Sequence, residues 1–295
     1  MRSVKEGFAP DVVTGSRYLQ LATLLLQRMR VASPVGGVWE AADIQWWSRQ
    51  ERATDRDGQL FWLDERGEPL AAVILTDFGH SVECDVLVLP EDPDYERTVW
   101  RAAIGRADAT GGAVEFPVRP DNAVGLAELT VAGLRPAAGP GPAAGPGVIS
   151  SWLEAGRRPK IPPLVPGYRL LSRAEAPGRP HPMIARNGAQ VEQRLRECSL
   201  YRPELDLMVE APDGQAAGYG LFWPDPVTGV GLVEPMRTEQ AHERRGIASH
   251  ILATGLDRLA AHGCQRLKVS NDIDLYLRAG FRPLQAATAS IYARG

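Results

Sequence analysis

Cysteine and histidine are scarce in this chain of 295 residues. The three cysteines, Cys84, Cys198 and Cys264, lie far apart and form no CxxC pair, so the sequence offers no disulfide framework. The five histidines show no metal-ligand spacing, because His242 and Glu243 are not followed by the second histidine of an HExxH helix. We therefore expect reduced thiols in a cytoplasmic protein that holds no metal.

The sequence also lacks long apolar runs and long basic runs. The apolar stretch over residues 21–26 is followed at once by Gln27 and Arg28. This stretch is far too short to cross a bilayer, so it predicts an amphipathic surface helix and no membrane partner. No run of lysine and arginine with interleaved aromatic residues occurs, which excludes nucleic acid as an expected partner.

Length and composition instead favour two globular domains. A chain of 295 residues suits two domains of ordinary size, and its 44% of hydrophobic residues can build their cores. Residues 1–148 carry 14 Lys+Arg against 21 Asp+Glu, whereas residues 149–295 carry 19 against 15. This asymmetry is either a random scatter of surface charge or a sign that only the second half receives a polyanion.

An internal repeat relates the two halves. The segment AGLRP at 132–136 recurs as AGFRP at 279–283, and the same offset of 147 aligns Glu96-Arg97 with Glu243-Arg244. Apolar periodicity predicts a similar alternation of strands and helices in both halves. We therefore expect an α/β (α+β layered) fold of two tandem domains, each a mixed twisted sheet flanked by helices.

The individual elements follow from apolar periodicity and turn residues. In the first half we expect helices near 17–31, 40–53, 94–109 and 122–132, and strands near 59–64, 69–76, 82–89 and 112–118. In the second half we expect helices over 191–198, from 246 to about 262 and around 275, and strands over 205–210, 216–223, 230–236, 266–270 and 289–293.

Two proline-rich segments compete as the domain boundary. The Pro/Gly/Ala tract over 135–147 is one of them, but in the second half the matching Arg-Pro leads into a last strand. We therefore interpret the tract as a loop before the first half's own last strand, near 149–153. The linker is then residues 157–166, between a first domain (1–156) and a second domain (167–295).

The most specific motif is a basic, glycine-containing turn between a strand and a helix. The strand ends near Met236, and the turn over 243–248 reads ERRGIA. A helix that begins here presents several backbone N–H groups and its positive dipole end to one point, which suits a pyrophosphate. Taken alone, the turn is equally the ordinary start of a surface helix.

This order of parts resembles the GCN5-related N-acetyltransferase (GNAT) family, whose turn Gln/Arg-x-x-Gly-x-Gly/Ala holds acetyl-CoA. The resemblance covers residues 167–295 well and the first half as a worn copy, and the tandem layout is similar to that of mycothiol synthase. It implies acetyl-CoA as co-substrate. The residues that it implies as coenzyme contacts are Met236, Arg237, Arg244, Arg245, Gly246, Ile247, Ala248 and Asn271.

Two departures qualify this resemblance, and one further feature agrees with it. Glu243 stands where the family has Gln or Arg, and Asn271 precedes Tyr276 by five positions, whereas the family leaves about seven. Pro235 interrupts a central strand, so it predicts a bulge there, as the family's splayed strand has.

The first half has lost the coenzyme turn. At the same offset Val99 replaces Gly246 and Arg101 replaces Ala248, while three carboxylates lie within 91–94. Side chains then obstruct the approach of a diphosphate, and the carboxylates repel it. We predict that the first half binds no coenzyme A and has a structural role or forms part of the acceptor pocket.

Two residues carry the expected chemistry. Direct acetyl transfer needs a neutral amine, and Glu234, beside the splayed strands, is the candidate general base; the alternative is a solvent-facing strand residue. By resemblance, Tyr276 is the candidate general acid for the departing thiolate. The alternative is an aromatic core residue packed on Phe281, although Leu129 occupies its position in the first half without a hydroxyl.

These features predict an acetyl-CoA-dependent N-acetyltransferase that acts on a small-molecule amine by direct attack in a ternary complex. Two alternatives stay open: a non-catalytic acyl-CoA-binding or protein-interaction module, and a protein lysine acetyltransferase. The acceptor is not readable from the sequence, since Trp46, Trp47, Tyr201 and Trp223 suit either a pocket or a core. The protein is expected to be a monomer or a homodimer.

Overall fold

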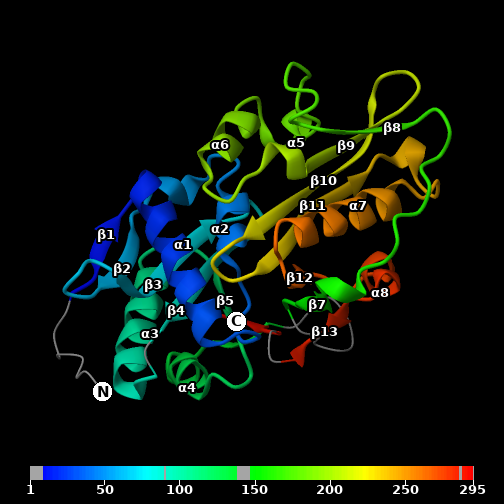
Figure 1. The fold of residues 1–295 in the computed structure, drawn as a ribbon. Helices are drawn as coiled ribbons and strands as arrows, with labels where there is room; N and C mark the ends of the chain where they lie inside the picture. Colours follow the sequence, from blue (N-terminus) through cyan, green and yellow to red (C-terminus); the bar gives the residue numbers. More distant parts are fainter. Residues whose placement is uncertain (1–8, 90, 138–146, 286–287, 295) are drawn as a thin grey trace. The chain divides into compact units, whose positions relative to one another are not determined.

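The computed structural model describes residues 9–89, 91–137, 147–285 and 288–294. The chain divides into two compact units (Figure 1). The first consists of Met1–Ala41, Glu51–Ile149 and Gln285–Gly295, and the second of Ala42–Gln50 and Ser150–Leu284. Each unit holds a mixed sheet of seven strands flanked by helices, which confirms the predicted α/β fold.

The predicted elements largely appear where the periodicity placed them. The elements of the first unit are β1 (Asp11–Val13), α1 (Gly15–Ala32), η1 (Ala53–Arg56), β2 (Gln59–Leu63), β3 (Pro69–Asp77), β4 (Val82–Val88), α3 (Pro93–Asp108), β5 (Val114–Val118), α4 (Ala123–Val131), β6 (Arg135–Pro136) and β14 (Ser290–Ala293). Those of the second are α2 (Ala41–Trp47, from its second residue on), β7 (Ser151–Glu154), η2 (Ala155–Arg157), β8 (Arg169–Ser172), α5 (Ile184–Asn187), α6 (Val191–Glu197), η3 (Pro203–Leu205), β9 (Asp206–Glu210), β10 (Ala216–Asp225), β11 (Val230–Thr238), η4 (Gln240–His242), α7 (Ile247–Ala261), β12 (Arg266–Val269), α8 (Asp274–Ala279) and β13 (Arg282–Pro283).

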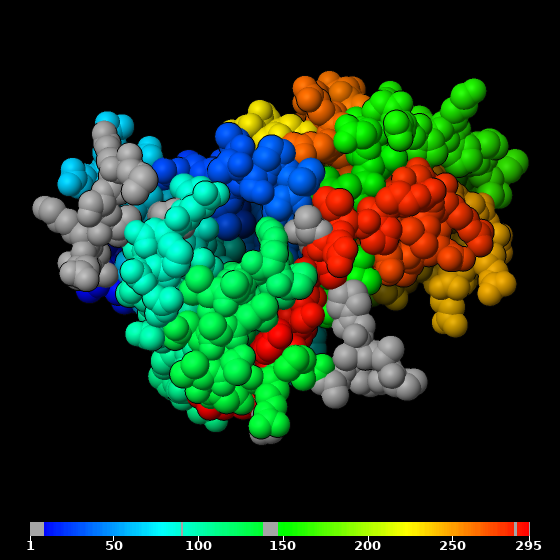
Figure 2. All heavy atoms as spheres, turned by 90° about the horizontal axis from the view of Figure 1, so that it is seen from below, coloured from blue at the N-terminus to red at the C-terminus, as the bar shows by residue number. Residues whose placement is uncertain are grey.

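The two sheets have the same strand order, and each contains one strand that was predicted for the other domain. The first runs β1-β2-β3-β4-β5-β14-β6 and the second β8-β9-β10-β11-β12-β7-β13. β7 pairs antiparallel with β12 and β13, and β14 pairs antiparallel with β5 and β6. In Figure 2 the red C-terminal atoms run along the green segment that holds α4 and β6.

This exchange overturns the prediction for the last strand of each half. The strand expected near 149–153 does form, but it belongs to the second sheet, and the strand near 289–293 belongs to the first. A period of two identifies a strand but not its partner, because pairing depends on contacts remote in sequence. Most of the 135–147 tract, residues 138–146, lies outside the described residues.

The proposed linker over 157–166 follows β7 and precedes β8, so it joins two strands of one sheet. It is also fastened to α7. Arg158 donates from Nε and Nη2 to Asp257 Oδ1 at 2.9 and 2.8 Å, and the His250 ring lies 2.7 Å from the Pro162 carbonyl. The segment is therefore a strap on the second unit.

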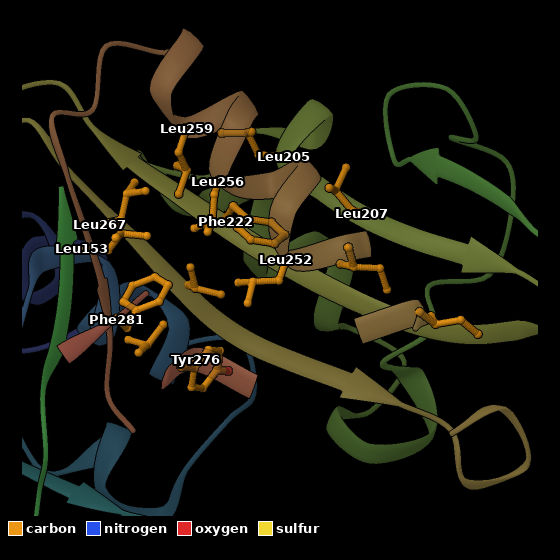
Figure 3. Packing of buried hydrophobic residues seen from close by; sticks show 14 of the residues in the cluster. Leu153, Leu205, Leu207, Phe222, Leu252, Leu256, Leu259, Leu267, Tyr276 and Phe281 are labelled. Carbon is orange, nitrogen blue, oxygen red and sulfur yellow. The ribbon is translucent and has the colours of Figure 1, made fainter. Parts of the chain in front are cut away.

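Helix α7 packs closely on the second sheet. Its apolar stripe includes Leu252, Leu256 and Leu259, which Figure 3 shows directed at Phe222 of β10. A Cβ on Gly255 would lie 2.1 Å from the Phe222 ring. Absence of a side chain at this position lets the helix approach the strand, and so fixes where the helix N-terminus points.

Helix α2 is packed into the second unit by its polar side chains. Gln45 donates from Nε2 to Ser199 Oγ and accepts from Leu200 N, both at 2.9 Å. Arg194 Nε donates to Ser48 O at 2.8 Å. These bonds hold α2, a helix from the N-terminal part of the chain, in a fixed position within the unit that contains the candidate site.

Candidate functional site

The candidate site lies where the two central strands of the second sheet separate. β11 and β12 run parallel and pair only from Val230–Arg266 to Leu232–Lys268. β12 ends at Val269, whereas β11 continues to Thr238. The backbone of β11 beyond Leu232 therefore has one edge that faces a gap instead of a strand, and a backbone edge of this kind can pair with an extended ligand.

On its other edge β11 remains paired with β10 through a bulge. Gly220 lies opposite Met236 and Phe222 opposite Val233, so two residues of β11 face one of β10. The extra residue confirms the bulge that Pro235 predicted, because a proline without an N–H is tolerated there.

Glu234 lies on the face of the sheet opposite α7. A Cβ on Gly231 would lie 2.8 Å from Leu259 of α7, and Val233 belongs to the core beneath that helix. Because side chains alternate along a strand, Glu234 is directed to the other face. Its carbonyl accepts a hydrogen bond from Trp223 Nε1 at 2.7 Å, which fixes the backbone at the bulge.

Helix α2 supplies the surroundings of the Glu234 carboxyl. Burial is the main cause that raises the pKa of Glu234 to about 7, and the nearby carboxylate of Asp43 adds to it. The guanidinium of Arg49 and a hydrogen bond from Trp46 act in the opposite direction and lower the pKa. Asp43 and Trp46 are one helical turn apart, so a single face of α2 presents both.

Lys268 lies on the same face of the sheet as Glu234, because it pairs with Leu232. Its side chain is completely buried, with Nζ 3.7 Å from Asp43 Oδ2 and 5.8 Å from the centre of the Trp152 ring. A fully buried ammonium is retained only where carboxylates and aromatic faces compensate its lost hydration. Asp43 thus faces both a buried cation and the candidate base.

Tyr276 projects from α8 into the core below α7. Its ring packs edge-on against Phe281, with centroids 5.9 Å apart, as in the core alternative (Figure 3). Burial, and secondly the charge of Glu234, raise the pKa of the Tyr276 phenol well above its ordinary value. The phenol therefore keeps its proton at neutral pH and can donate it, so packing and proton donation are compatible here.

The turn before α7 has the backbone shape that the motif predicted. Gly246 is the N-cap residue with φ of 77°, and Arg244 has φ of 59°. The first closed hydrogen bond of the helix runs from His250 N to Gly246 O. The N–H groups of the preceding turn, including those of Ile247 and Ala248, therefore point off the helix end, where the dipole favours an anion.

Next to this turn, α7, α8 and the strap enclose a cavity of about 360 Å³. Its lining includes Ser249 and Leu252 of α7, Leu275 and Arg278 of α8, and Lys160 of the strap. Arg278 pairs with Asp274, which also lines the cavity, at 3.0 Å. The apolar walls and Lys160 suit a molecule with both a hydrocarbon part and phosphates.

The other expected coenzyme contacts differ in what they can offer. Met236 and Arg237 lie on the splayed part of β11, and the Arg237 side chain lies 3.5 Å from Glu239 Oε1. Asn271 Oδ1 accepts from the backbone N–H groups of Asp272 at 2.8 Å and Ile273 at 3.2 Å. Asn271 thus uses its oxygen in the turn that precedes α8, and its Nδ2 is the group that it can present to a ligand.

In the first unit the corresponding helix end is occupied by its own side chain. Asp92 is the N-cap of α3 and accepts from Asp94 N at 3.0 Å and Tyr95 N at 3.2 Å. A carboxylate thus fills the place where a phosphate would bind, consistent with the prediction that this half binds no coenzyme A.

Sequence reasoning identified Glu234 and the turn but missed the residues that surround the base. Asp43 and Arg49 lie 191 and 185 residues before Glu234 in the sequence, and Lys268 lies on the neighbouring strand β12. The sequence did contain an indication of these surroundings. The expected helix near 40–53 carries an acidic residue, Asp43, beside two tryptophans, Trp46 and Trp47, on its otherwise apolar side. Nothing local shows which sheet that helix covers.

Two kinds of feature are absent from the described residues. No group of three or more His, Cys, Asp and Glu residues that could hold a metal ion occurs among them. Within the same residues, no helix is both long enough and apolar enough to cross a membrane.

Known proteins resemble this chain in sequence over part of its length and in fold over nearly all of it. The model of the acetyltransferase (GNAT) family matches residues 169–281. A GCN5-related N-acetyltransferase from Sphaerobacter thermophilus is similar in structure, with a TM-score of 0.60, 14% identity, and coverage of 99% of this chain and 96% of that one. A tandem GNAT protein from the clavulanic acid biosynthesis pathway has a TM-score of 0.62, 15% identity, and coverage of 97% and 98%. At these identities the likeness shows the fold. No curated protein sequence matches the chain.

Proposed function

Because residues 169–281 form a domain of the acetyltransferase (GNAT) family, we propose that this protein is an acetyl-CoA-dependent N-acetyltransferase that acts on a small-molecule amine. The fold supports acyl-CoA-dependent acetyl transfer in general. The observation that carries the finer proposal is the combination of the gap beside β11, the open helix end at Gly246 and a carboxyl of raised pKa at the same strand.

The second unit offers groups for each part of the coenzyme. We assign the pyrophosphate to the N–H groups of residues 246–248, with Arg244 and Arg245 providing positive charge. The pantetheine arm would pair with backbone groups of Met236 and Arg237, and the Asn271 amide is a further contact.

The reaction joins the amine nitrogen to the acetyl carbon and breaks the bond between that carbon and sulfur. In this proposal Glu234 accepts the proton that the amine loses, directly or through water, and Tyr276 donates a proton to the sulfur. A pKa of about 7 suits a general base, because the carboxylate form is populated at neutral pH and still holds a proton appreciably.

The test is calorimetric titration of acetyl-CoA into the wild-type protein and the Gly246→Glu variant. We expect one site per chain in the wild type and no binding in the variant, because a carboxylate would occupy the anion position. Release of free thiol with a panel of small amines then measures turnover. Absence of binding to the wild-type protein would refute the proposal.

A non-catalytic acyl-CoA-binding module is the second candidate, and the short spacing of five positions from Asn271 to Tyr276 favours it, since the Asn271 oxygen is used in the intervening turn. The variant Tyr276→Phe distinguishes the two. In an enzyme, coenzyme binding persists while turnover falls by about 10²-fold or more. In a binding module no amine, including lysine peptides, gives turnover with the wild-type protein.

A further inference from the structure

The first unit contains a cavity of about 480 Å³, which lies at the position where its own central strands separate. β4 and β5 pair only at Val82–Val114 and Glu83–Glu115, and the cavity is lined by the continuation of β4 and the end of β5. Its remaining walls are the C-terminal end of α1 with the following loop and the first turns of α3 and α4. In Figure 2 the blue, cyan and green segments that line it meet on the face shown. The volume is typical of a site for a small organic molecule.

The charges on this lining exclude an anion. The lining has four carboxylates, Asp85, Glu91, Glu96 and Asp121, and two guanidiniums, Arg30 and Arg119. Arg30 forms a buried ion pair with Glu40, which is outside the lining, and Arg119 pairs with Asp121. Both cations are therefore already compensated, and the carboxylates dominate the potential inside. Asp92 also occupies the end of α3, as described above.

The carboxylate at the floor is buried. Asp85 is 2% exposed and accepts a hydrogen bond from Trp39 Nε1. Its neighbour on the same face of β4, Glu83, has a pKa raised by burial and then by the charges of Asp85 and Glu115. Two carboxylates that share a buried strand face are stabilised by any cation that approaches them.

Two indole rings complete the wall, Trp39 beside Asp85 and Trp100 beside Glu96, whose Oε1 lies 3.4 Å from Trp100 Nε1. Carboxylates next to aromatic faces are the combination that binds ammonium groups attached to an apolar body, since the ring attracts the cation and packs on the hydrocarbon.

We propose that this cavity of the first unit is a second ligand site, specific for a small organic ammonium compound with an apolar or aromatic body. The site is separate from the coenzyme site and does not depend on acetyl transfer. It assigns a binding function to the half of the chain that has lost the coenzyme turn.

Calorimetric titration of the full chain with tryptamine, its neutral analogue tryptophol and its anionic analogue indole-3-propionate tests this proposal. We expect tryptamine to bind and the neutral and anionic analogues to bind at least about tenfold more weakly. Glu91→Gln and Glu96→Gln should each weaken tryptamine binding about threefold to tenfold, because each removes a lining carboxylate without disturbing the buried core. Glu65→Gln, an exposed residue outside the lining, is the matched control and should leave binding unchanged.

Binding to an acceptor site in the second unit is distinguished by Glu234→Gln, which should leave tryptamine binding in the cavity unaffected. The proposal would be overturned if the three analogues bound equally or if tryptamine did not bind. It would also be overturned if Glu234→Gln abolished tryptamine binding and Glu96→Gln did not. Failure of acetyl-CoA to bind the wild-type protein would leave it intact.

Discussion

The charge of Asp43 sets part of the pKa of Glu234, and the Asp43→Asn substitution isolates its effect. The difference between the ordinary value of 4.5 and about 7 corresponds to about 3 kcal/mol of preference for the protonated carboxyl. Burial is the largest cause of this shift, and the charge of Asp43 is the second. For scale, two unit charges separated by about 10 Å at an effective dielectric constant of about 20 interact by roughly 2 kcal/mol, or about one pKa unit.

We therefore expect Asp43→Asn to lower the pKa of Glu234 by about one unit. Asparagine keeps the volume of the side chain and removes the negative charge that helps to raise the pKa of Glu234. The opposite result is expected for Arg49→Gln, because the guanidinium of Arg49 lowers the pKa in the wild-type protein. The two substitutions thus bracket the wild-type value from both sides.

The assay is a pH titration of the carboxyl ¹³C signals of labelled glutamate, in which the signal of Glu234 is assigned by its loss in Glu234→Gln. This measurement needs no knowledge of the acceptor amine. An unchanged pKa in both variants, with the fold intact by circular dichroism, would refute the idea that α2 tunes this carboxyl. A pKa near 4.5 in the wild-type protein would refute the burial argument itself.

Three further predictions concern stability and the turn. Glu234 has a higher pKa in the folded state than in the unfolded state, so the stability of the wild-type protein falls as the pH rises from about 4.5 to about 7. In urea unfolding, Glu234→Gln should therefore be more stable than the wild type by up to about 3 kcal/mol at pH 8, with little difference at pH 4. Gly246→Ala forces a side chain into a φ of 77°, so it should lower the free energy of unfolding, measured by thermal unfolding, by about 1 kcal/mol and also weaken acetyl-CoA binding. The control is Gly263→Ala, which is also at positive φ but at the other end of α7, and which should lower stability alone. Gly255→Ala places a Cβ 2.1 Å from an aromatic ring and should destabilise the protein by about 1–3 kcal/mol. Gly105→Ala in α3, which has open space around it, should instead stabilise the protein by up to about 1 kcal/mol, and equal effects at the two sites would contradict the packing argument.

The parts of this fold that the sequence predicted are those that depend on neighbours along the chain. α7 was predicted from a stripe of leucine and isoleucine at helical spacing, and its start from a glycine, and both appear within a residue or two. The bulge at Pro235 follows equally from one local fact, the missing N–H. These features need no information about the rest of the chain.

The parts that were missed depend on contacts between remote segments. β7 has the alternation of a strand, but its partners, β12 and β13, lie more than 100 residues further along the chain. Likewise α2 was assigned to the first domain because it lies there in the sequence, and its role beside Glu234 could not be read from residues 40–53 alone. Glu234 could be singled out from the sequence as the candidate base, but its electrostatic surroundings could not, because those are assembled by tertiary packing.

The exchanged strands also determine the order in which the protein can be completed during synthesis. A first domain ordinarily folds while the rest of its chain is still being translated. Here the edges of β5 and β6 stay without β14 until residues 290–293 have left the ribosome, so the half that is made first is finished last. Until then the nascent chain carries an open sheet edge that can pair with other chains. A chain that stops before residue 290 would therefore lack a strand of the first sheet, whereas the described strands of the second sheet would all have been made.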